Sequence, residues 1–162
     1  MQIRQVKIKD LESINQIIFK NFSYDERPSK EKIKERIKFS SDFFYILEDD
    51  DKVISFIYGF LTKDEVMNDD FFNSNKHKNK GEYFYLSTLC TKKEYQSKGY
   101  GNALLSFIEI ELRKRNVKQI FLITKKENIC FYEKHKFVLE EKTIINKNGK
   151  IYYVMKKKLK GQ

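Results

Sequence analysis

Apolar and polar residues alternate at the start of the chain and then change to a helical spacing. The alternation predicts a first strand over residues 2–8. Next, apolar residues recur three or four positions apart, so we expect a helix over residues 11–22, with Asp10 as its N-terminal cap. Ser29 is placed to cap a second helix that ends near residue 39 and has a thin apolar face. The chain therefore begins with one strand and two helices.

Most of the remaining strands are apolar or β-branched runs that polar turns separate. They are expected over residues 43–47, 53–61, 83–91, 119–124, 137–146 and 149–158. Two further helices are predicted over residues 102–115 and 127–135. The first of these joins two strands, which should therefore pair in parallel through a right-handed crossover.

The connections complete this outline of the fold. Asn148-Gly149 is a strong signal for a tight hairpin between the last two strands. The polar stretch over residues 63–80 is long for a connection, and such segments are usually functional or mobile. Because no linker or repeat interrupts the pattern, we expect one domain over residues 1–160 with the order βααβββαβαββ.

The strand over residues 83–91 leads through a polar turn with two glycines into a helix. This order aims free backbone N–H groups at an anion, and the helix dipole adds roughly half a positive charge. Gly99 and Gly101 lack a Cβ, so a ligand can approach the backbone closely. A glycine pair alone is about as often an ordinary helix-entry turn.

Composition narrows the class of protein. The net charge is +10, but the lysines are spread along the chain, which favours a solvated surface over a nucleic-acid interface. No apolar run is long enough for a membrane helix and no signal-peptide pattern is present, so we expect a cytoplasmic protein. Cys90 and Cys130 are expected to be buried thiols, and no metal site is predicted.

The glycine turn reads Gln96-x-x-Gly99-x-Gly101, which resembles the pyrophosphate motif of the GNAT superfamily of acyl-CoA N-acyltransferases. The element order is similar as well. The resemblance implies an α/β (α+β) fold with a mixed, mostly antiparallel sheet of about seven strands, a splayed central parallel pair and flanking helices. It also implies an acetyl-CoA-dependent N-acetyltransferase that acts on a primary amine by direct attack, as a monomer or homodimer.

The resemblance also assigns roles to residues. Backbone N–H groups would hold the pyrophosphate of acetyl-CoA, and a strand edge would pair with the pantetheine arm. The pyrophosphate set is Gln96, Ser97, Lys98, Gly99, Tyr100, Gly101 and Asn102, and the pantetheine set is Leu89, Cys90 and Thr91. Asn128 and Tyr132 match a second family motif, in which the tyrosine protonates the leaving thiolate. Lys136 stands where that motif has glycine, which would cost about 1–2 kcal/mol in a left-handed backbone.

The base and the acceptor are less defined. Glu82, just before the central strand, is the candidate general base, directly or through water, whereas His77 and His135 are expected to be exposed and idle. The resemblance places the acceptor amine between residues 23–29 and 146–150. Asp25 and Glu26 could favour a cationic acceptor there, although solvated loop charges are the simpler explanation.

Three interpretations remain open from the sequence. The first is the N-acetyltransferase. The second is a non-catalytic acyl-CoA-binding or sensor module of the same fold. The third, nucleic-acid binding, draws only on the positive charge and gains nothing from the glycine turn.

Overall fold

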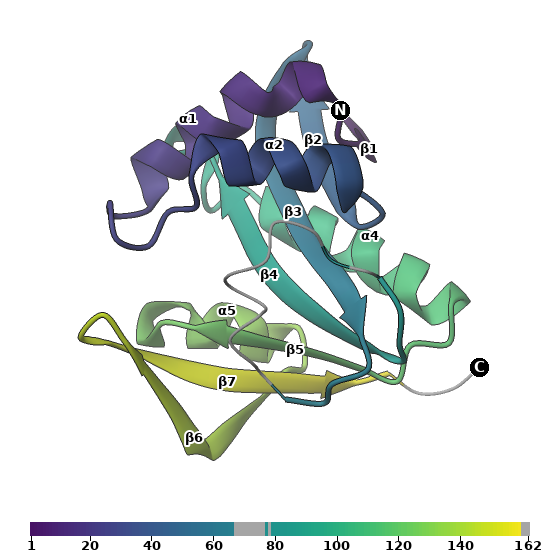
Figure 1. Ribbon diagram of the computed structural model, residues 1–162, viewed down its shortest axis with the longest axis vertical. Coiled ribbons are helices and arrows are strands. Elements are labelled where there is room, and N and C mark those ends of the chain that lie inside the picture. The colour runs from purple at the N-terminus through teal and green to yellow at the C-terminus, as the bar shows by residue number, and fades with distance from the viewer. Residues whose placement is uncertain (67–76, 78, 160–162) are drawn as a thin grey trace.

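The computed structural model describes residues 1–66, 77 and 79–159, and for residues 141–144 it describes the backbone alone. Seven strands form one sheet in the order β1-β2-β3-β4-β5-β7-β6 (Figure 1). All neighbouring strands are antiparallel except the parallel pair β4 and β5. The strands are β1 Gln2–Gln5, β2 Phe44–Asp49, β3 Lys52–Thr62, β4 Tyr83–Thr91, β5 Gln119–Thr124, β6 Val138–Lys147 and β7 Lys150–Lys158.

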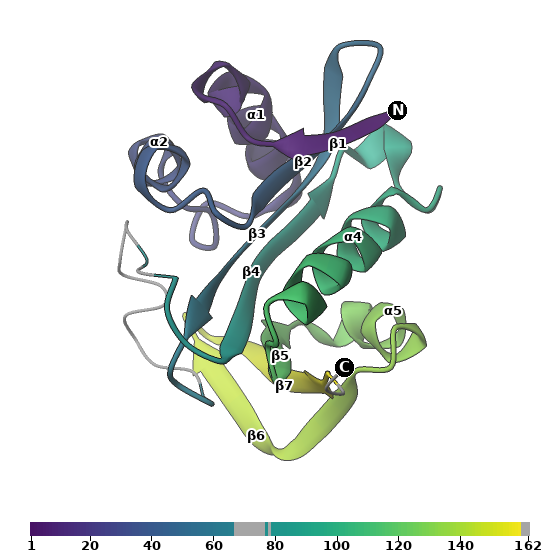
Figure 2. The same ribbon diagram turned by 90° about the vertical axis from the view of Figure 1, so that its right-hand side faces the viewer.

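Helices cover both faces of this sheet. They are α1 Leu11–Asn21, α2 Lys30–Phe39, α4 Tyr100–Lys114 and α5 Ile129–Lys134. Figure 2 shows α1 and α2 on one face and α4 and α5 on the other. Two clusters of buried apolar side chains fill the two layers, one beneath α1 and α2 and one beneath α4. Because β3 lies between both layers, its residues 53–60 are all buried, which explains why they are almost all apolar.

The predicted element order βααβββαβαββ is confirmed, as are the β2–β3 and β6–β7 hairpins and the parallel pairing of β4 with β5. Ser29 caps α2 as expected, since its Oγ accepts a hydrogen bond from the N–H of Lys32 at 3.1 Å. Asn148 and Gly149 both have positive φ, as a tight hairpin of this type requires. Most of the polar stretch over residues 63–80 lies outside the described residues.

The first strand and the cap at Asp10 differ from the prediction. β1 ends at Gln5, and residues 8–10 form a 3-10 turn ahead of α1. The Asp10 carboxylate makes no capping bond to α1. It is buried and accepts two hydrogen bonds of 2.9 Å from the Arg4 guanidinium, which also bonds to Glu48. A paired, buried carboxylate is strongly held, so this ion pair replaces the cap.

Helix α4 begins at Tyr100, two residues before the predicted start. Gly99 is its N-cap and has φ of 91°, a left-handed backbone that glycine adopts without strain. The carbonyl of Gly99 accepts the N–H of Ala103 at 3.0 Å, which closes the first helical turn. The helix therefore takes in the second glycine of the turn, Gly101.

Within the described ranges, none of the helices combines the length and apolar character that a membrane-spanning segment requires. The same residues contain no group of three or more His, Cys, Asp or Glu side chains arranged to hold a metal ion.

Candidate active site

The two central parallel strands pair over only part of their length. Register runs from Tyr83 opposite Gln119 to Tyr85 opposite Phe121 and then stops, although β4 continues for six more residues. At this point β4 bulges: Tyr58 of β3 faces Thr88 and the next residue faces Leu86, which leaves Ser87 as an extra residue. A bulge bends its strand, so β4 leaves β5 here and the sheet opens.

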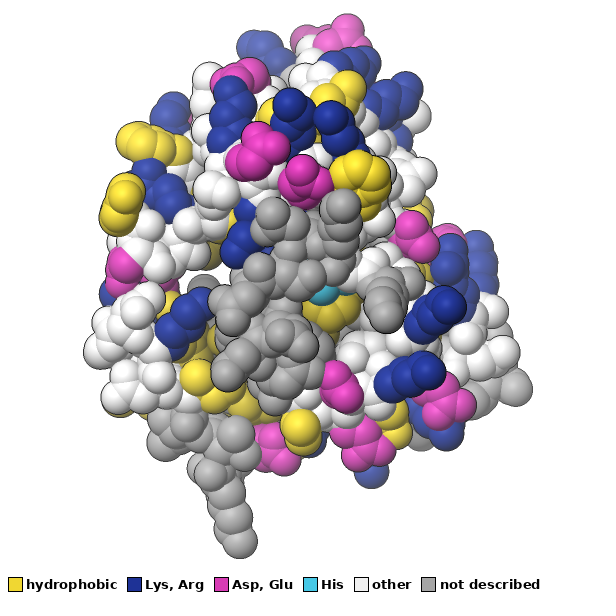
Figure 3. All heavy atoms as spheres, in the orientation of Figure 1, with side chains coloured by type: hydrophobic (Ala, Val, Ile, Leu, Met, Phe, Trp, Pro, Cys, Tyr) yellow, Lys and Arg dark blue, Asp and Glu magenta, His cyan; other side chains and the backbone are white. Residues whose placement is uncertain are grey.

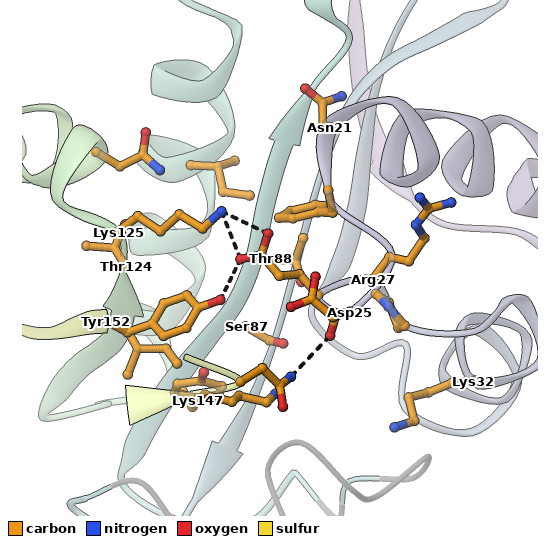
Figure 4. A pocket seen from close by; sticks show the side chains of 18 of the residues that line it. Asn21, Asp25, Arg27, Lys32, Ser87, Thr88, Thr124, Lys125, Lys147 and Tyr152 are labelled. Atoms are coloured by element: carbon orange, nitrogen blue, oxygen red, sulfur yellow. Dashed lines mark hydrogen bonds and ion pairs between the residues drawn. The ribbon is translucent and has the colours of Figure 1, made fainter. Parts of the chain in front are cut away.

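A cavity of about 450 Å³ lies at this opening. Its walls come from the ends of β4 and β5, the α1–α2 loop, α2, the beginning of α5 and the β6–β7 hairpin (Figure 4). Since α2 and α5 lie on opposite faces of the sheet, the cavity reaches from one face to the other (Figure 2). Its walls include Ser87, Thr88, Leu89, Thr124, Asn128 and Tyr132.

Tyr132 lines the cavity from α5. Its ring packs edge-on against Phe131 and Phe137, with centroids 5.0 and 5.6 Å away. Burial raises the pKa of the Tyr132 hydroxyl, because the phenolate would lose its hydration. The phenol is therefore neutral near pH 7 and can act as a proton donor.

The first turn of α4 presents backbone N–H groups without acceptors. Among the described residues, the amides of Tyr100, Gly101 and Asn102 have no hydrogen-bond partner, and no side chain caps this end of α4. A Cβ on Gly101 would lie 3.6 Å from the Phe131 ring of α5 and 4.0 Å from the Leu89 side chain of β4, so α4 begins close against both elements. The unpaired amides at this helix end can therefore receive an anion.

Gln96 supports the turn in another way than predicted. Its N–H already donates to the carbonyl of Lys93 at 3.3 Å. Its side-chain amide donates to the carbonyl of Thr91 at 3.0 Å and to Asn21 at 2.9 Å. Gln96 thus ties the turn to β4 and α1, whereas Ser97 and Lys98 are exposed beside the helix end.

The backbone groups of successive β4 residues point alternately towards β3 and towards the opening between β4 and β5. The Lys92 N–H donates to Ile54 of β3 at 2.9 Å, and the Cys90 carbonyl accepts from Ser55 of β3 at 2.9 Å. The backbone groups of Leu89 and Thr91 must then point away from β3, towards the opening. Of the three residues expected to pair with a pantetheine arm, Cys90 is turned the other way.

Glu26 anchors three walls of the cavity to one another. Its carboxylate, from the α1–α2 loop, accepts hydrogen bonds from Lys125 after β5 at 2.8 Å and from the Tyr152 hydroxyl of β7 at 2.5 Å. Lys150 lies 3.2 Å away, and Ser23 donates at 2.7 Å. Burial alone would raise the pKa of Glu26, but these donors outweigh it and hold the pKa well below its usual range.

Residues 9–137 match the family described as the acetyltransferase (GNAT) family, which is well over half of the chain. The chain belongs to the GNAT family of acetyltransferases. Its GNAT fold also appears in solved structures of low sequence identity, which bear on the fold alone. No curated protein sequence matches the chain at a significant level.

Three of these solved structures are similar to this chain over nearly its whole length. The loading GNATL domain of CurA from Lyngbya majuscula is 18% identical, with a TM-score of 0.83 over 97% of this chain and 96% of that one. The PaiA N-acetyltransferase from Thermoplasma acidophilum in complex with coenzyme A is 23% identical, with a TM-score of 0.70 over 98% of both chains. The ribosomal-protein-S18-alanine N-acetyltransferase from Escherichia coli is 17% identical, with a TM-score of 0.71 over 99% and 96%.

The structure does not bring Glu82 to the GNAT cavity. Glu82 is exposed, pairs with Lys118 at 2.8 Å and is not among the cavity-lining residues. It precedes β4, five residues before the bulge at Ser87, which corresponds to roughly 16 Å along an extended strand. The candidate general base and Tyr132 therefore lie at different ends of β4.

The histidines and one cysteine also differ from expectation. His77 and His135 are half-buried rather than exposed. His77 bonds to the Tyr58 hydroxyl and stacks on Phe60, and a ring nitrogen of His135 lies 2.5 Å from the Asn102 side-chain oxygen. Cys130 is exposed on α5, whereas Cys90 is buried as predicted, and burial raises the pKa of its thiol to about 12.

Several cavity residues were missed by the sequence analysis. They are Arg36, Lys125 and Tyr152, whereas Arg27 and Lys147 fall within the ranges 23–29 and 146–150 that were expected near the acceptor. Only Lys125 had a usable signal, because it directly follows a buried parallel strand, and ligands gather at the carboxyl ends of such strands. The others lie on surface elements whose orientation no local pattern reveals.

Proposed function

We propose that this chain is an N-acetyltransferase that transfers the acetyl group of acetyl-CoA to a primary amine by direct attack. The observation that carries the proposal is the set of unpaired amides of Tyr100, Gly101 and Asn102 beside a gap in the parallel pair. These amides and the helix dipole would hold the diphosphate of coenzyme A. The family match supports acyl-CoA as the donor.

The strand edge fits the next part of the donor. Backbone groups of Leu89 and Thr91 that point away from β3 would pair with the amide groups of the pantetheine arm. The thioester would then lie in the cavity, near Tyr132 and Asn128, which both line it. Acetyl-CoA supplies the activated acyl group, and the chain supplies its position.

Acyl transfer requires the protein to stabilise negative charge on the thioester oxygen and to protonate the leaving sulfur. The N–H of Leu89 would donate to the thioester carbonyl oxygen as negative charge develops there. Tyr132, kept neutral by burial, would give its hydroxyl proton to the leaving sulfur. No covalent acyl-enzyme is required, and the Cys90 thiol with its pKa raised to about 12 is a poor nucleophile.

The cavity supplies no evident base. Asp25 and Glu26 are the carboxylates among its described lining residues. Hydrogen bonds from Ser23 and Lys150 lower the pKa of Asp25, and those from Lys125 and Tyr152 outweigh burial and lower the pKa of Glu26. We therefore propose that the acceptor amine reacts as its neutral form after losing its proton to water. A lysine-like amine has a pKa near 10.4, so roughly one molecule in a thousand is neutral at pH 7.

The test combines binding with turnover. Saturation with coenzyme A at about 100 times Kd should stabilise the protein by about 2.7 kcal/mol, a rise in Tm of several degrees. Gly101→Glu would place a carboxylate next to the unpaired amides and a bulky side chain against Phe131, and should abolish this shift. Ala103→Glu is the matched control, since it adds the same charge to the same helix turn at an exposed position.

Turnover is measured as thiol release from acetyl-CoA with a panel of amines. Release with at least one amine supports the enzyme. Binding without release from any amine would instead identify a non-catalytic acyl-CoA-binding module. A Gly101→Glu protein that still responded to coenzyme A would overturn the diphosphate site itself.

A further inference from the structure

The charges that line the cavity are mostly positive. Among the described lining residues there are two carboxylates and five cationic side chains, Arg27, Lys32, Arg36, Lys125 and Lys147. Both carboxylates are already engaged: Glu26 by Lys125, Lys150 and Tyr152, and Asp25 by Lys150 at 3.1 Å. They therefore offer little free negative charge to a cationic ligand, contrary to the expectation that Asp25 and Glu26 favour one.

Arg36 is the most unusual of these cations. It lies in the last turn of α2, is 5% exposed and lines the cavity. Among the described residues its guanidinium has no hydrogen bond or ion pair, and its Nε is buried without a partner. The central carbon of its guanidinium lies 4.9 Å from the centroid of the Tyr58 ring. A buried charge without a counter-ion is costly, so this side chain is suited to receive an anion.

A second arginine, Arg27, lines the same cavity from the α1–α2 loop. The Arg27 Nε is also buried without a partner among the described residues, and its planar group stacks 4.1 Å from the Phe19 ring centroid. Stacking of this kind holds the guanidinium in one orientation. Figure 4 shows Arg27 and Lys32 on the same side of the cavity.

Two lysines strengthen the positive field at this end. Lys32 lies one turn before Arg36 on α2, and Lys147 reaches in from the end of β6 (Figure 4). The pKa of Lys32 is lowered by burial and further by the positive charges of Arg36 and Lys147.

We propose that the acceptor amine carries an oxyanion, a carboxylate or a phosphate, which Arg36 and Arg27 bind while the amino group reaches the thioester. The inference rests on the proposed function and specifies its acceptor. The guanidinium fork matches the geometry of these oxyanions. The diphosphate of coenzyme A does not account for the two arginines, because none of residues 96–102 lines this cavity.

The experiment compares matched amines in the thiol-release assay. β-Alanine and 2-aminoethyl phosphate carry an oxyanion, whereas β-alaninamide and 1,4-diaminobutane do not. We expect kcat/KM for at least one anionic amine to exceed that of β-alaninamide by about tenfold to a hundredfold, the range for one or two charge-assisted hydrogen bonds. The two anionic amines show which oxyanion is preferred.

Variants locate the effect. Arg36→Met should reduce kcat/KM for the anionic amine to the level of β-alaninamide, and Arg27→Gln should reduce it in part. Lys38→Met removes a charge from an exposed position of the same helix and should leave the preference unchanged. Because Arg36 is buried, an unchanged coenzyme A-induced rise in Tm verifies that each variant is folded. If Arg36→Met does not fold, the inference is tested with Arg27→Gln alone, through the expected partial loss of kcat/KM for the anionic amine.

Failure of this inference is distinguishable from failure of the proposed function. Equal or faster turnover of the uncharged or cationic amines would overturn it while leaving the acetyltransferase in place. If no amine is turned over, Tm is measured with sodium phosphate or β-alanine against sodium chloride at equal ionic strength, with coenzyme A present. Stabilisation that Arg36→Met or Arg27→Gln removes would support the anion site, and no stabilisation would refute it.

Discussion

Replacing Glu26 with glutamine tests how the walls of the cavity are held together. The Glu26 side chain is 8% exposed and joins the α1–α2 loop to Lys125 and to the β6–β7 hairpin. Glutamine has the same shape, and its carbonyl oxygen can still accept the Tyr152 hydroxyl. It lacks the charge, however, and it turns an NH₂ group towards two lysines.

The expected loss follows from these contacts. Hydrogen bonds to a buried charge contribute about 1.5–3 kcal/mol each, but Lys125 and Lys150 are 37% and 35% exposed and regain hydration when the carboxylate is removed. We therefore expect Glu26→Gln to lower the free energy of unfolding by about 2 kcal/mol. For a chain of 162 residues, this corresponds to a fall in Tm of about 4–8 °C.

The effect should depend on pH in a defined direction. The pKa of Glu26 is depressed in the folded protein, so its stabilising contribution is complete above the unfolded pKa, roughly 4.3. Below that pH the unfolded state takes up the proton first, and the difference between wild type and Glu26→Gln should shrink by about 1.4 kcal/mol per pH unit. Urea unfolding between pH 3.5 and 8 measures this profile.

Asp25→Asn is the matched control. Asp25 is adjacent, also pairs with Lys150, and is exposed. Because water screens an exposed pair, this variant should leave Tm nearly unchanged. The reasoning fails if Glu26→Gln destabilises the protein no more than Asp25→Asn does, or if its effect is the same at pH 3.5 as at pH 7.

Three further predictions concern the second half of the chain. Lys136 has φ of 70°, so Lys136→Gly should raise the free energy of unfolding by about 1 kcal/mol in urea titrations, whereas Lys136→Ala keeps the strain and should bring no gain. In the native protein at pH 8, one equivalent of iodoacetamide should react, at the exposed Cys130. The Cys90 thiol should not react, because it is buried and its pKa is raised to about 12. Reaction of two equivalents at similar rates would contradict that burial. Tyr132→Phe should lower the rate of thiol release at least tenfold without changing coenzyme A affinity, and unchanged release would reduce Tyr132 to a packing role.

Local patterns in the sequence determined the elements and their order. Apolar periodicity, Ser29 and the Asn148-Gly149 turn depend on neighbours a few residues away, so they can be interpreted without the fold. The glycine turn belongs to this class too, because N–H groups at a helix end are a local property. Lys136 was expected at a left-handed position only through the resemblance to the family motif, which has glycine there.

Tertiary structure decided what meets at the cavity. Glu26 and Tyr152 are 126 residues apart in sequence, and their hydrogen bond depends on how the β6–β7 hairpin lies against the α1–α2 loop. Asp25 and Glu26 alone suggest a cationic acceptor, but the fold engages their carboxylates with lysines and leaves the Arg36 guanidinium without a counter-ion among the described residues. The sign of the field that a ligand experiences depends on such long-range pairing, because an ion pair cancels charges that the sequence can only count.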